Sequence, residues 1–556
     1  MSSYNKNASH SFAFLPQTKI KRNVFDRSHE YKTTMDAGYL VPLLVDEVLP
    51  GDTITLNNLS IFSRINTLTV PIMDNLYMEC FAWSVPSRLV WDHWKNFNGE
   101  TVNPGDSTDF LVPQVVAPSG GFTVGSVADY FGLPVNVPNL SVSALPFRAL
   151  NLIYNEWYRD ENLQNSLIVQ KGDGPDNYSL YPLFRRGKRH DYFTSSLPWP
   201  QKGDSVSLAL SGNASVTVSN LNIYGNGMAM GLDTNNASYG LVTGNSGANQ
   251  GLMAWVGARG TGSGTGISNN AQPVNNVSMG LSVDPRYSGI TGYGNGIADL
   301  SSVSAVGINN LRNAIQVQAF RELDARGGTR YTEIIRAHFG VISPDARLQR
   351  PELLAVSSSM MQVNTVPQTS STDATTPQAN LSAYGVFAQS QLHFSKSFTE
   401  HGYIFILANI RADLTYQQGI DRMWSRKTRL DYFWPLLSGI GEQAVYNKEI
   451  YAQGTEDDNG IFGYQERYAE YRYFPSKITG KLRSGVDGSL DVWHLSQYFT
   501  SLPKLNSQFI EDNPPIDRVI AVQDEPQFTV DCHFQGYKCV RPIPLFGIPS
   551  SLGVHL

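Results

Sequence analysis

The chain opens and closes with segments whose apolar residues follow the repeat of β-strands. Residues 39–49 form an apolar run before Pro50-Gly51, and this pair suits a type II turn because proline presets φ and glycine accepts a positive φ. Residues 76–85 are apolar on both alternating faces, which predicts a strand covered on both sides. Further strands are expected at residues 398–414, 518–522 and 528–534.

Two stretches carry the longer repeat of helices. Residues 146–163 begin with a proline, which suits the first helical turn, and they bring Leu150, Ile153, Tyr154 and Trp157 onto one stripe. Residues 309–326 place apolar side chains four apart and stop at a Gly-Gly pair, after which a shorter helix ends near Gly340. We expect the first helix to pack across a sheet.

Residues 205–307 differ in composition from everything around them. They hold 19 of the 48 glycines, no lysine and only five charged residues. Such composition often indicates disorder, but many aliphatic and aromatic side chains remain. An alternating pattern around Gly212-Asn213 predicts a hairpin with one apolar face, and the glycine clusters at 260–266 and 292–296 are expected to be mobile tips. The hairpin face comprises Val206, Leu208, Leu210, Val216 and Val218.

Composition narrows the class of protein. The chain has 556 residues, 41% of them hydrophobic and only 16% charged, which excludes a disordered, collagenous or coiled-coil protein. Because a soluble monomer keeps its exterior charged, the low charge indicates that partners cover much of the surface. The net charge of -6 means that any nucleic-acid contact must come from a local basic patch.

The sequence contains none of the common motifs for catalysis or metal binding that we considered. The chain has no P-loop, no HExxH and no GxSxG motif, so we expect no enzyme and no cofactor. The spacing of Cys532-His533 and Cys539 suits no common zinc module, which favours buried thiols on a strand. With Cys80 these are the only cysteines, too few for a disulfide framework. We also expect neither a signal peptide nor membrane insertion.

Two basic segments are candidates for binding nucleic acid. Residues 185–190 include five basic groups with aromatic residues interleaved, and residues 1–35 form a polar, basic arm. Cations offset phosphate charge and rings stack on unpaired bases, so both segments favour single-stranded DNA. Pairing with carboxylates of a neighbouring subunit is the alternative. The candidate DNA-binding residues are Lys19, Lys21, Arg22, Arg185, Arg186, Lys188 and Arg189.

Four long strings carry a family resemblance. They read HSFAFLPQTKIKRNVFDRSHEYKTTMDAGYLVPLLVDEVLPGDT near the start, LPFRALNLIYNEWYRDENLQ at residues 145–164, RRGKRHDYFTSSLPWPQKG at 185–203 and ELDARGGTRYTEIIRAHFGVISPDARLQRPELL at 322–354. The chain resembles the major capsid proteins of gokushoviruses, small microvirus phages with circular single-stranded DNA. The match covers most of residues 10–204 and 308–556, and it does not extend to the insertion.

The resemblance implies a mainly β fold, an eight-stranded antiparallel jelly roll with long loop insertions and a few helices. It implies sixty copies in a T=1 icosahedral shell around single-stranded DNA, a chain made in the bacterial cytoplasm and located in the virion. A host surface receptor and a small internal DNA-binding or minor virion protein are further implied partners. An all-β carbohydrate-binding adhesin or polysaccharide hydrolase is the alternative that an aromatic-rich β chain leaves open.

The composition of the chain and the resemblance together set the expected organisation. Residues 1–35 form the arm, residues 36–204 the first part of the jelly roll with a helical insertion, and residues 308–556 its helices and remaining strands. Residues 205–307 project at the three-fold axes as the host-attachment surface. The expected three-fold contacts are the five residues of the hairpin face, Val206, Leu208, Leu210, Val216 and Val218, together with Trp255.

Overall fold

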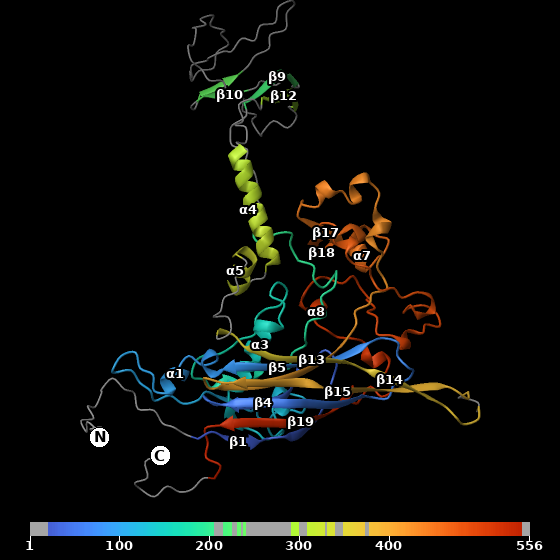
Figure 1. Cartoon of the computed structure of the whole chain (residues 1–556). Coiled ribbons are helices and arrows are strands. Elements are labelled where there is room, and N and C mark those ends of the chain that lie inside the picture. The colour runs from blue at the N-terminus through green and yellow to red at the C-terminus, as the bar shows by residue number, and fades with distance from the viewer. Residues whose placement is uncertain are drawn as a thin grey trace, which may run out of the picture. The chain divides into compact units, whose positions relative to one another are not determined.

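The computed structural model describes residues 21–204, 215–224, 231–234, 237–240, 291–299, 308–327, 331–339, 349–372 and 377–546. The chain divides into two compact units, one of Met1–Ser205 with Val317–Leu556 and one of Val206–Gln316. The first unit is built on two large antiparallel β-sheets, with its helices and loops attached to them (Figure 1).

The first sheet has six strands in the order β1-β19-β4-β15-β14, and β2 also pairs with β19. The second sheet has four strands in the order β13-β5-β16-β3. Strands of the first sheet are β1 (Asn23–Asp26), β2 (His29–Met35), β4 (Thr53–Ile65), β14 (Gln362–Pro367), β15 (Leu381–Ser397) and β19 (Phe528–Arg541). Those of the second are β3 (Val41–Val48), β5 (Leu76–Pro86), β13 (Glu352–Met360) and β16 (Gly402–Ala412).

The order in which the chain visits these sheets is that of a jelly roll. It alternates from β2 to β3, β4 and β5, stays in the second sheet for β13, and then passes through β15 and β16 to β19. The expected mainly β jelly-roll class is confirmed. Strands β1 and β14 extend the first sheet beyond this set.

Strand β5 of the second sheet has buried residues on both faces, as its sequence predicts. On β5, Met78, Cys80 and Ala82 belong to the core between the two sheets, whereas Trp83 and Val85 belong to a second core on the opposite face. That second core is closed by α3 (Leu145–Trp157), the predicted helix, and by the segments around it. A strand in the middle of three layers needs apolar residues on both sides because neither side meets water.

Helix α3 shows both the strength and the limit of the sequence prediction. Leu150, Ile153 and Tyr154 are buried on the predicted stripe. The helix ends at Trp157 rather than at residue 163, because Oδ1 of Asp160 accepts hydrogen bonds from the backbone N–H groups of residues 162 and 163 and so forms a turn.

The two later helices lie where they were predicted, as α4 (Ile308–Arg326) and α5 (Tyr331–Phe339). Arg326, at the end of α4, forms ion pairs with Glu442 and Glu466. The strand predicted at 518–522 is wrong. A 3-10 turn at Ile516–Arg518 lies there instead, and its buried residues follow a three-residue spacing that a strand pattern cannot produce.

The described part of the second unit is β-rich. Strand β9 (Ser215–Tyr224) pairs with β12 (Thr291–Asp299), and β10 (Gly231–Thr234) pairs with β11 (Ala237–Gly240). The expectation that residues 292–296 are a mobile tip is wrong, because they lie inside β12 at an irregularity that glycines allow. Val216 and Val218 lie on β9. Val206, Leu208, Leu210, Trp255 and the cluster at 260–266 lie outside the described residues.

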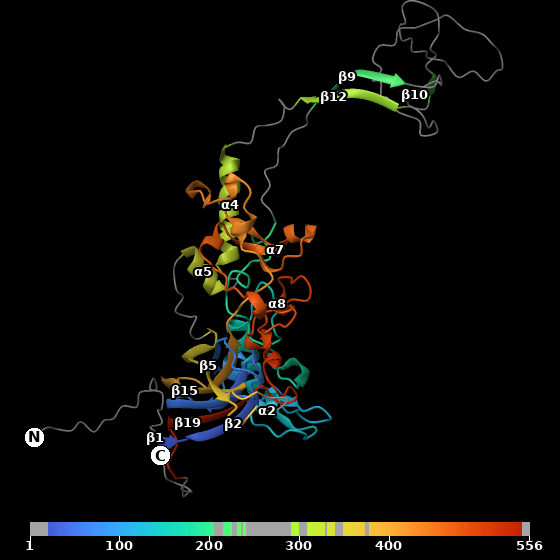
Figure 2. The same ribbon diagram turned by 90° about the vertical axis from the view of Figure 1, so that its right-hand side faces the viewer.

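The chain between β16 and β19 forms a third apolar cluster of the first unit together with Tyr192 and Phe193. Figure 2 shows α7 and α8 of this part of the chain. It contains β17 (Glu442–Tyr446), β18 (Ile461–Glu466), α7 (Asn447–Ile450) and α8 (Ser507–Ile510). Elsewhere in this unit lie α1 (Trp94–Phe97), α2 (Val127–Tyr130) and a small sheet of β6 (Gln114–Val116), β7 (Ser141–Ser143) and β8 (Asp176–Asn177).

The N-terminal arm is shorter than expected. Residues 23–35, assigned to the arm from their polar composition, form β1 and β2 at the side of β19. A polar segment becomes a strand here because its partner comes from the other end of the chain, which no local pattern reveals.

Gly38 marks the point where three distant segments meet. Its N–H donates to the carbonyl of Ile410 at 2.9 Å, and its own carbonyl accepts from the N–H of Arg186 at 2.8 Å. The carbonyl of Arg186 in turn accepts from the N–H of Asp512 at 2.8 Å. Gly38 has a φ of +84°, and a Cβ at this position would overlap the carbonyl oxygen of Asp512.

We expect Gly38→Ala to lower the free energy of unfolding by about 2–5 kcal/mol, because left-handed strain and overpacking add. Gly99→Ala is the matched control, since Gly99 has a φ of +95° but open space around it. The free energy of unfolding of this control variant should fall by only about 1–2 kcal/mol. Both free energies are measured by denaturant unfolding. An equal decrease in the two variants would contradict the close packing of residue 512 on Gly38.

Candidate assembly surface and the basic cluster

The basic cluster at residues 185–189 finds its counter-charges within its own subunit. Arg186 and Arg189 both form ion pairs with Glu79 on β5, the latter at 3.0 Å. Arg411 on β16 donates to the same carboxylate at 2.6 Å, and Arg189 also contacts Asp413 at 3.0 Å. Burial alone would raise the pKa of Glu79, but the charges of Arg186 and Arg411 outweigh it and hold that pKa below its usual value.

The other two cations of the cluster, Arg185 and Lys188, also contact groups of their own subunit. Arg185 donates to the Asp512 carbonyl at 3.1 Å and to Oδ1 of Asn513 at 2.9 Å, with its guanidinium 4.1 Å from the centre of the Tyr39 ring. Lys188 is buried with Nζ 4.4 Å from the centre of the Phe509 ring, and burial lowers its pKa to about 8. The cluster therefore supports the fold, and its role in DNA binding stays a prediction.

The aromatic residues interleaved with these cations are part of the core. Tyr181, Phe184, Tyr192 and Phe193 are all buried. Of the candidate residues in the arm, Lys21 is exposed, and Arg22 donates to Oγ1 of Thr53 at 2.6 Å. Lys19 lies outside the described residues. The structure thus does not bring the two predicted basic segments into one patch.

Glu79→Gln should destabilise the subunit by about 3–5 kcal/mol, because three arginines lose a shared and largely buried counter-charge. The control is Asp413→Asn, which removes a carboxylate that contacts only Arg189 among these arginines and is 39% exposed. We expect it to cost less than about 1 kcal/mol. The measurement is denaturant unfolding of both variants, and a small effect of Glu79→Gln would refute the structural role.

A large apolar surface lies exposed on the segment between β16 and β19. We call it the aromatic-arginine surface. The side chains that define it are between 38% and 92% exposed, with Leu436 the most exposed. They are Ile420, Met423, Trp424, Leu430, Tyr432, Phe433, Trp434, Leu436, Ile440, Tyr471 and Phe474.

The backbone that carries this surface is fixed by carboxylates. It consists of three 3-10 turns, Arg422–Ser425, Arg429–Asp431 and Pro435–Leu437. Oδ1 of Asp421 accepts from the N–H of Met423 at 2.9 Å, and Oδ2 of Asp431 accepts from the N–H of Thr428 at 2.7 Å. Backbone hydrogen bonds from Thr428 and Lys427 hold the pKa of Asp431 below its usual value. The apolar residues are therefore presented in a defined arrangement.

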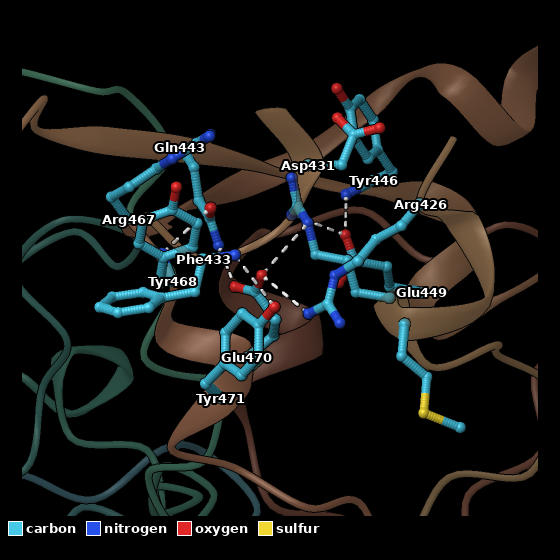
Figure 3. Close-up of polar contacts among 12 residues, drawn as sticks. Arg426, Asp431, Phe433, Gln443, Tyr446, Glu449, Arg467, Tyr468, Glu470 and Tyr471 are labelled. Atoms are coloured by element: carbon cyan, nitrogen blue, oxygen red, sulfur yellow. Dashed lines mark hydrogen bonds and ion pairs between the residues drawn. The ribbon is translucent and has the colours of Figure 1, made fainter. Parts of the chain in front are cut away.

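Behind the turns lies a network of arginines and carboxylates (Figure 3). Glu470 accepts from Nε2 of Gln443 at 2.5 Å and from Arg426 at 3.4 Å. Glu449 accepts from the N–H of Tyr446 at 2.9 Å, and burial raises the pKa of its carboxyl group. These contacts anchor the segment to β17 and α7.

Guanidinium groups also stack on rings of the surface. Arg426 lies 4.3 Å from the centre of the Tyr471 ring, and Arg429 lies 4.5 Å from that of Trp434. Exposed tryptophan, tyrosine and arginine held in place by a rigid frame are the residues that dominate protein–protein contacts. Nine of the eleven residues lie in IDRMWSRKTRLDYFWPLLSGI at residues 420–440, where the apolar residues follow neither the strand nor the helix repeat, so the hydrophobic pattern does not predict this surface.

Other chemistry is sparse in the described part of the chain. No group of three or more potential metal ligands occurs among those residues, and none of their helices is long and apolar enough to span a membrane. Cys532 and Cys539 on β19 are free and buried, as predicted, and Cys80 is buried opposite them in the same core. Burial raises the pKa of all three thiols, which makes them unreactive.

A jelly roll with long insertions is a fold found in viral coat subunits. The family model described as "Capsid protein (F protein)" matches residues 13–551, and the chain belongs to this family of structural proteins. The match supports a capsid protein rather than the alternative of an adhesin or hydrolase.

Curated relatives agree over the whole length. The chain is 47% identical to capsid protein VP1 of Bdellovibrio phage phiMH2K over 98% of both chains. It is 44% identical to capsid protein VP1 of Chlamydia phage 1 and 37% identical to that of Spiroplasma virus 4, each over 97% of both chains. The resemblance to gokushovirus capsid proteins is thereby confirmed, and the chain is a capsid protein that assembles into a shell.

Proposed function

We propose that sixty copies of this chain form a T=1 icosahedral shell around circular single-stranded DNA, and that the aromatic-arginine surface joins neighbouring copies. The observation that carries this proposal is the exposure of eleven large apolar side chains on one ordered segment. A monomer in water rarely leaves such an area uncovered, and a stable contact needs roughly 800 Å² on each partner.

The chemistry of the surface favours another protein copy over DNA. Arg422 and Arg426 are bound to Glu449 and Glu470, so their charges are already offset within the subunit. The exposed side chains that remain are mainly apolar, and their burial is worth about 1.5–3 kcal/mol for each large residue. A neighbouring copy of the chain can cover these side chains with apolar surface of its own, whereas the phosphates of a polyanion cannot.

Leu436→Asp should abolish or strongly reduce particle formation while leaving the subunit folded, because the side chain is 92% exposed and contributes nothing to the core. Leu111→Ser, at an exposed leucine outside the surface, is the control and should assemble normally. Sedimentation velocity and negative-stain images measure assembly, and the thermal transition checks the fold. Normal particles from Leu436→Asp would contradict the assignment.

The insertion is proposed to carry host attachment at the three-fold axes. In support, Val206–Gln316 form a compact unit separate from the jelly roll, and residues 205–307 are rich in glycine and asparagine with few charges. Such a segment tolerates change without disturbing the main core. Val206, Leu208, Leu210, Val216, Val218 and Trp255 are the proposed three-fold contacts. A host receptor and a minor virion protein complete the proposed set of partners.

Replacing residues 219–300 by a short Gly/Ser linker should give particles that form and hold DNA but adsorb poorly to the host. The reason is that the jelly roll and the aromatic-arginine surface lie wholly outside the deletion. Adsorption is measured as loss of free particles from a suspension of host cells. Adsorption at the normal rate would refute attachment through the insertion, and failure to form particles would show that the insertion stabilises the shell.

A further inference from the structure

The six-stranded sheet has one face that no described segment covers, which we call the open face. On β4, Ile54, Leu56 and Ile61 point into the core between the sheets and are buried. The residues that alternate with them, from Thr53 to Arg64, are half-buried or exposed. The second sheet, by contrast, has an apolar cluster on each face. In Figure 1, α3 and α8 lie on the far side of the second sheet from β19 and β1.

The open face is lined by hydroxyl and amide groups. Thr53 and Ser397 are hydrogen-bonded across β4 and β15 at 2.8 Å, and Thr55 and Ser395 form the same pair at 2.8 Å. Such groups are common donors to phosphate and sugar oxygens. The polar uncharged residues of this face include Thr34, Thr53, Thr55, Ser60, Ser395, Ser397, Thr529 and Gln535.

The acidic residues of the open face lie beside basic side chains of the same face. Glu30 pairs with Lys32 at 2.9 Å, and Asp531 lies 3.7 Å from Lys32 and 3.3 Å from His533. Asp26 accepts from the N–H and the hydroxyl of Ser28 at 3.0 and 2.6 Å. Asp26 also lies opposite Lys538 in the register of β1 and β19. With Arg64 and Arg22 included, these described residues of the face are four cations against three carboxylates.

Its unpaired charge is positive. Arg64, on β4, is exposed, and its side chain has neither an ion pair nor a hydrogen bond to the described residues. Arg22 binds only the Thr53 hydroxyl and the Val540 carbonyl, so its charge is not offset by a carboxylate. This differs from Arg186 and Arg189, whose charges are already offset by Glu79 and Asp413.

Two exposed rings flank Arg64. Phe62 lies two residues before it on β4, and Tyr384 lies on β15 two residues from Val386, the register partner of Arg64. Both rings are 45% exposed. A cation between two flat rings on a polar sheet is the arrangement that single-stranded nucleic acid binds, with phosphates at the cation and bases stacked on the rings.

We propose that the open face binds single-stranded DNA, with Arg64 and Arg22 at phosphates, the hydroxyl rows at the backbone and Phe62 and Tyr384 stacked on bases. The inference rests on the proposed function, because a shell subunit must turn one face toward its contents. Charge complementarity selects a polyanion as the occupant. A second copy of the chain would need more apolar area than these two rings supply.

The test is binding of the full chain to oligothymidylate, followed by fluorescence anisotropy over a range of salt concentrations. Arg64→Gln should lower the slope of log affinity against log salt by about 0.7, the value for one phosphate contact to a single strand. Arg64→Lys should restore the slope. Phe62→Ser should weaken binding by about 5- to 150-fold at constant slope, because stacking is not ionic.

Lys481→Gln is the matched control, since this exposed lysine lies between β16 and β19, away from the open face, and its slope should match that of the unmodified chain. An unchanged slope for Arg64→Gln overturns the proposal, and a reduced slope for Arg189→Gln alone returns DNA binding to residues 185–189. Particle formation by each variant is measured separately. If the open-face variants form particles normally and bind DNA with unchanged affinity and slope, the DNA-binding role of the open face is refuted and the assembly proposal stands.

Discussion

The pairing of β19 with β4 and β2 is the interaction on which the rest of the subunit depends. β19 brings residues 528–541 from the end of the chain between strands from its first 65 residues. Only then do Phe528, Val530 and Cys532 complete the core between the sheets. Contacts between residues some 500 positions apart carry a high entropic cost of closure, so the jelly roll forms as a whole rather than from independent halves.

A second set of long-range contacts, around Glu79 and Gly38, joins the jelly roll to the chain that follows β16. Glu79 on β5 gathers arginines from residues 186, 189 and 411, and Gly38 lets the backbone of residue 512 approach the same region. A buried carboxylate with several arginine partners adds specificity because a misplaced segment would leave charges unpaired in a low-dielectric site. The basic segment that looks like a DNA ligand thus stabilises the join between the jelly roll and the chain that follows β16.

The subunit presents two surfaces of opposite chemistry. The aromatic-arginine surface is mainly apolar, with Arg422 and Arg426 bound to Glu449 and Glu470. The open face is polar, and the side chain of Arg64 on it has no ion pair with any described residue. An apolar surface gains most from contact with protein, and a hydroxyl-rich cationic surface gains most from contact with phosphate. This division suits a subunit that must bind its neighbours along one surface and the genome on another.

The sequence by itself determined the class of fold, the strand pattern of β5, the stripe of α3, the buried thiols of β19 and, through long matching strings, the capsid family. These features are local, because alternation and helical repeats are written in neighbouring residues. Only the tertiary structure decided that residues 23–26 and 29–35 are strands, that Glu79 pairs with Arg186 and that the Arg64 side chain has no ion pair with the residues that the structure describes. The reason is physical: charge pairing and strand pairing join residues far apart in sequence, so the counter-ion of a cation or the partner of a polar strand exists only once the chain has folded.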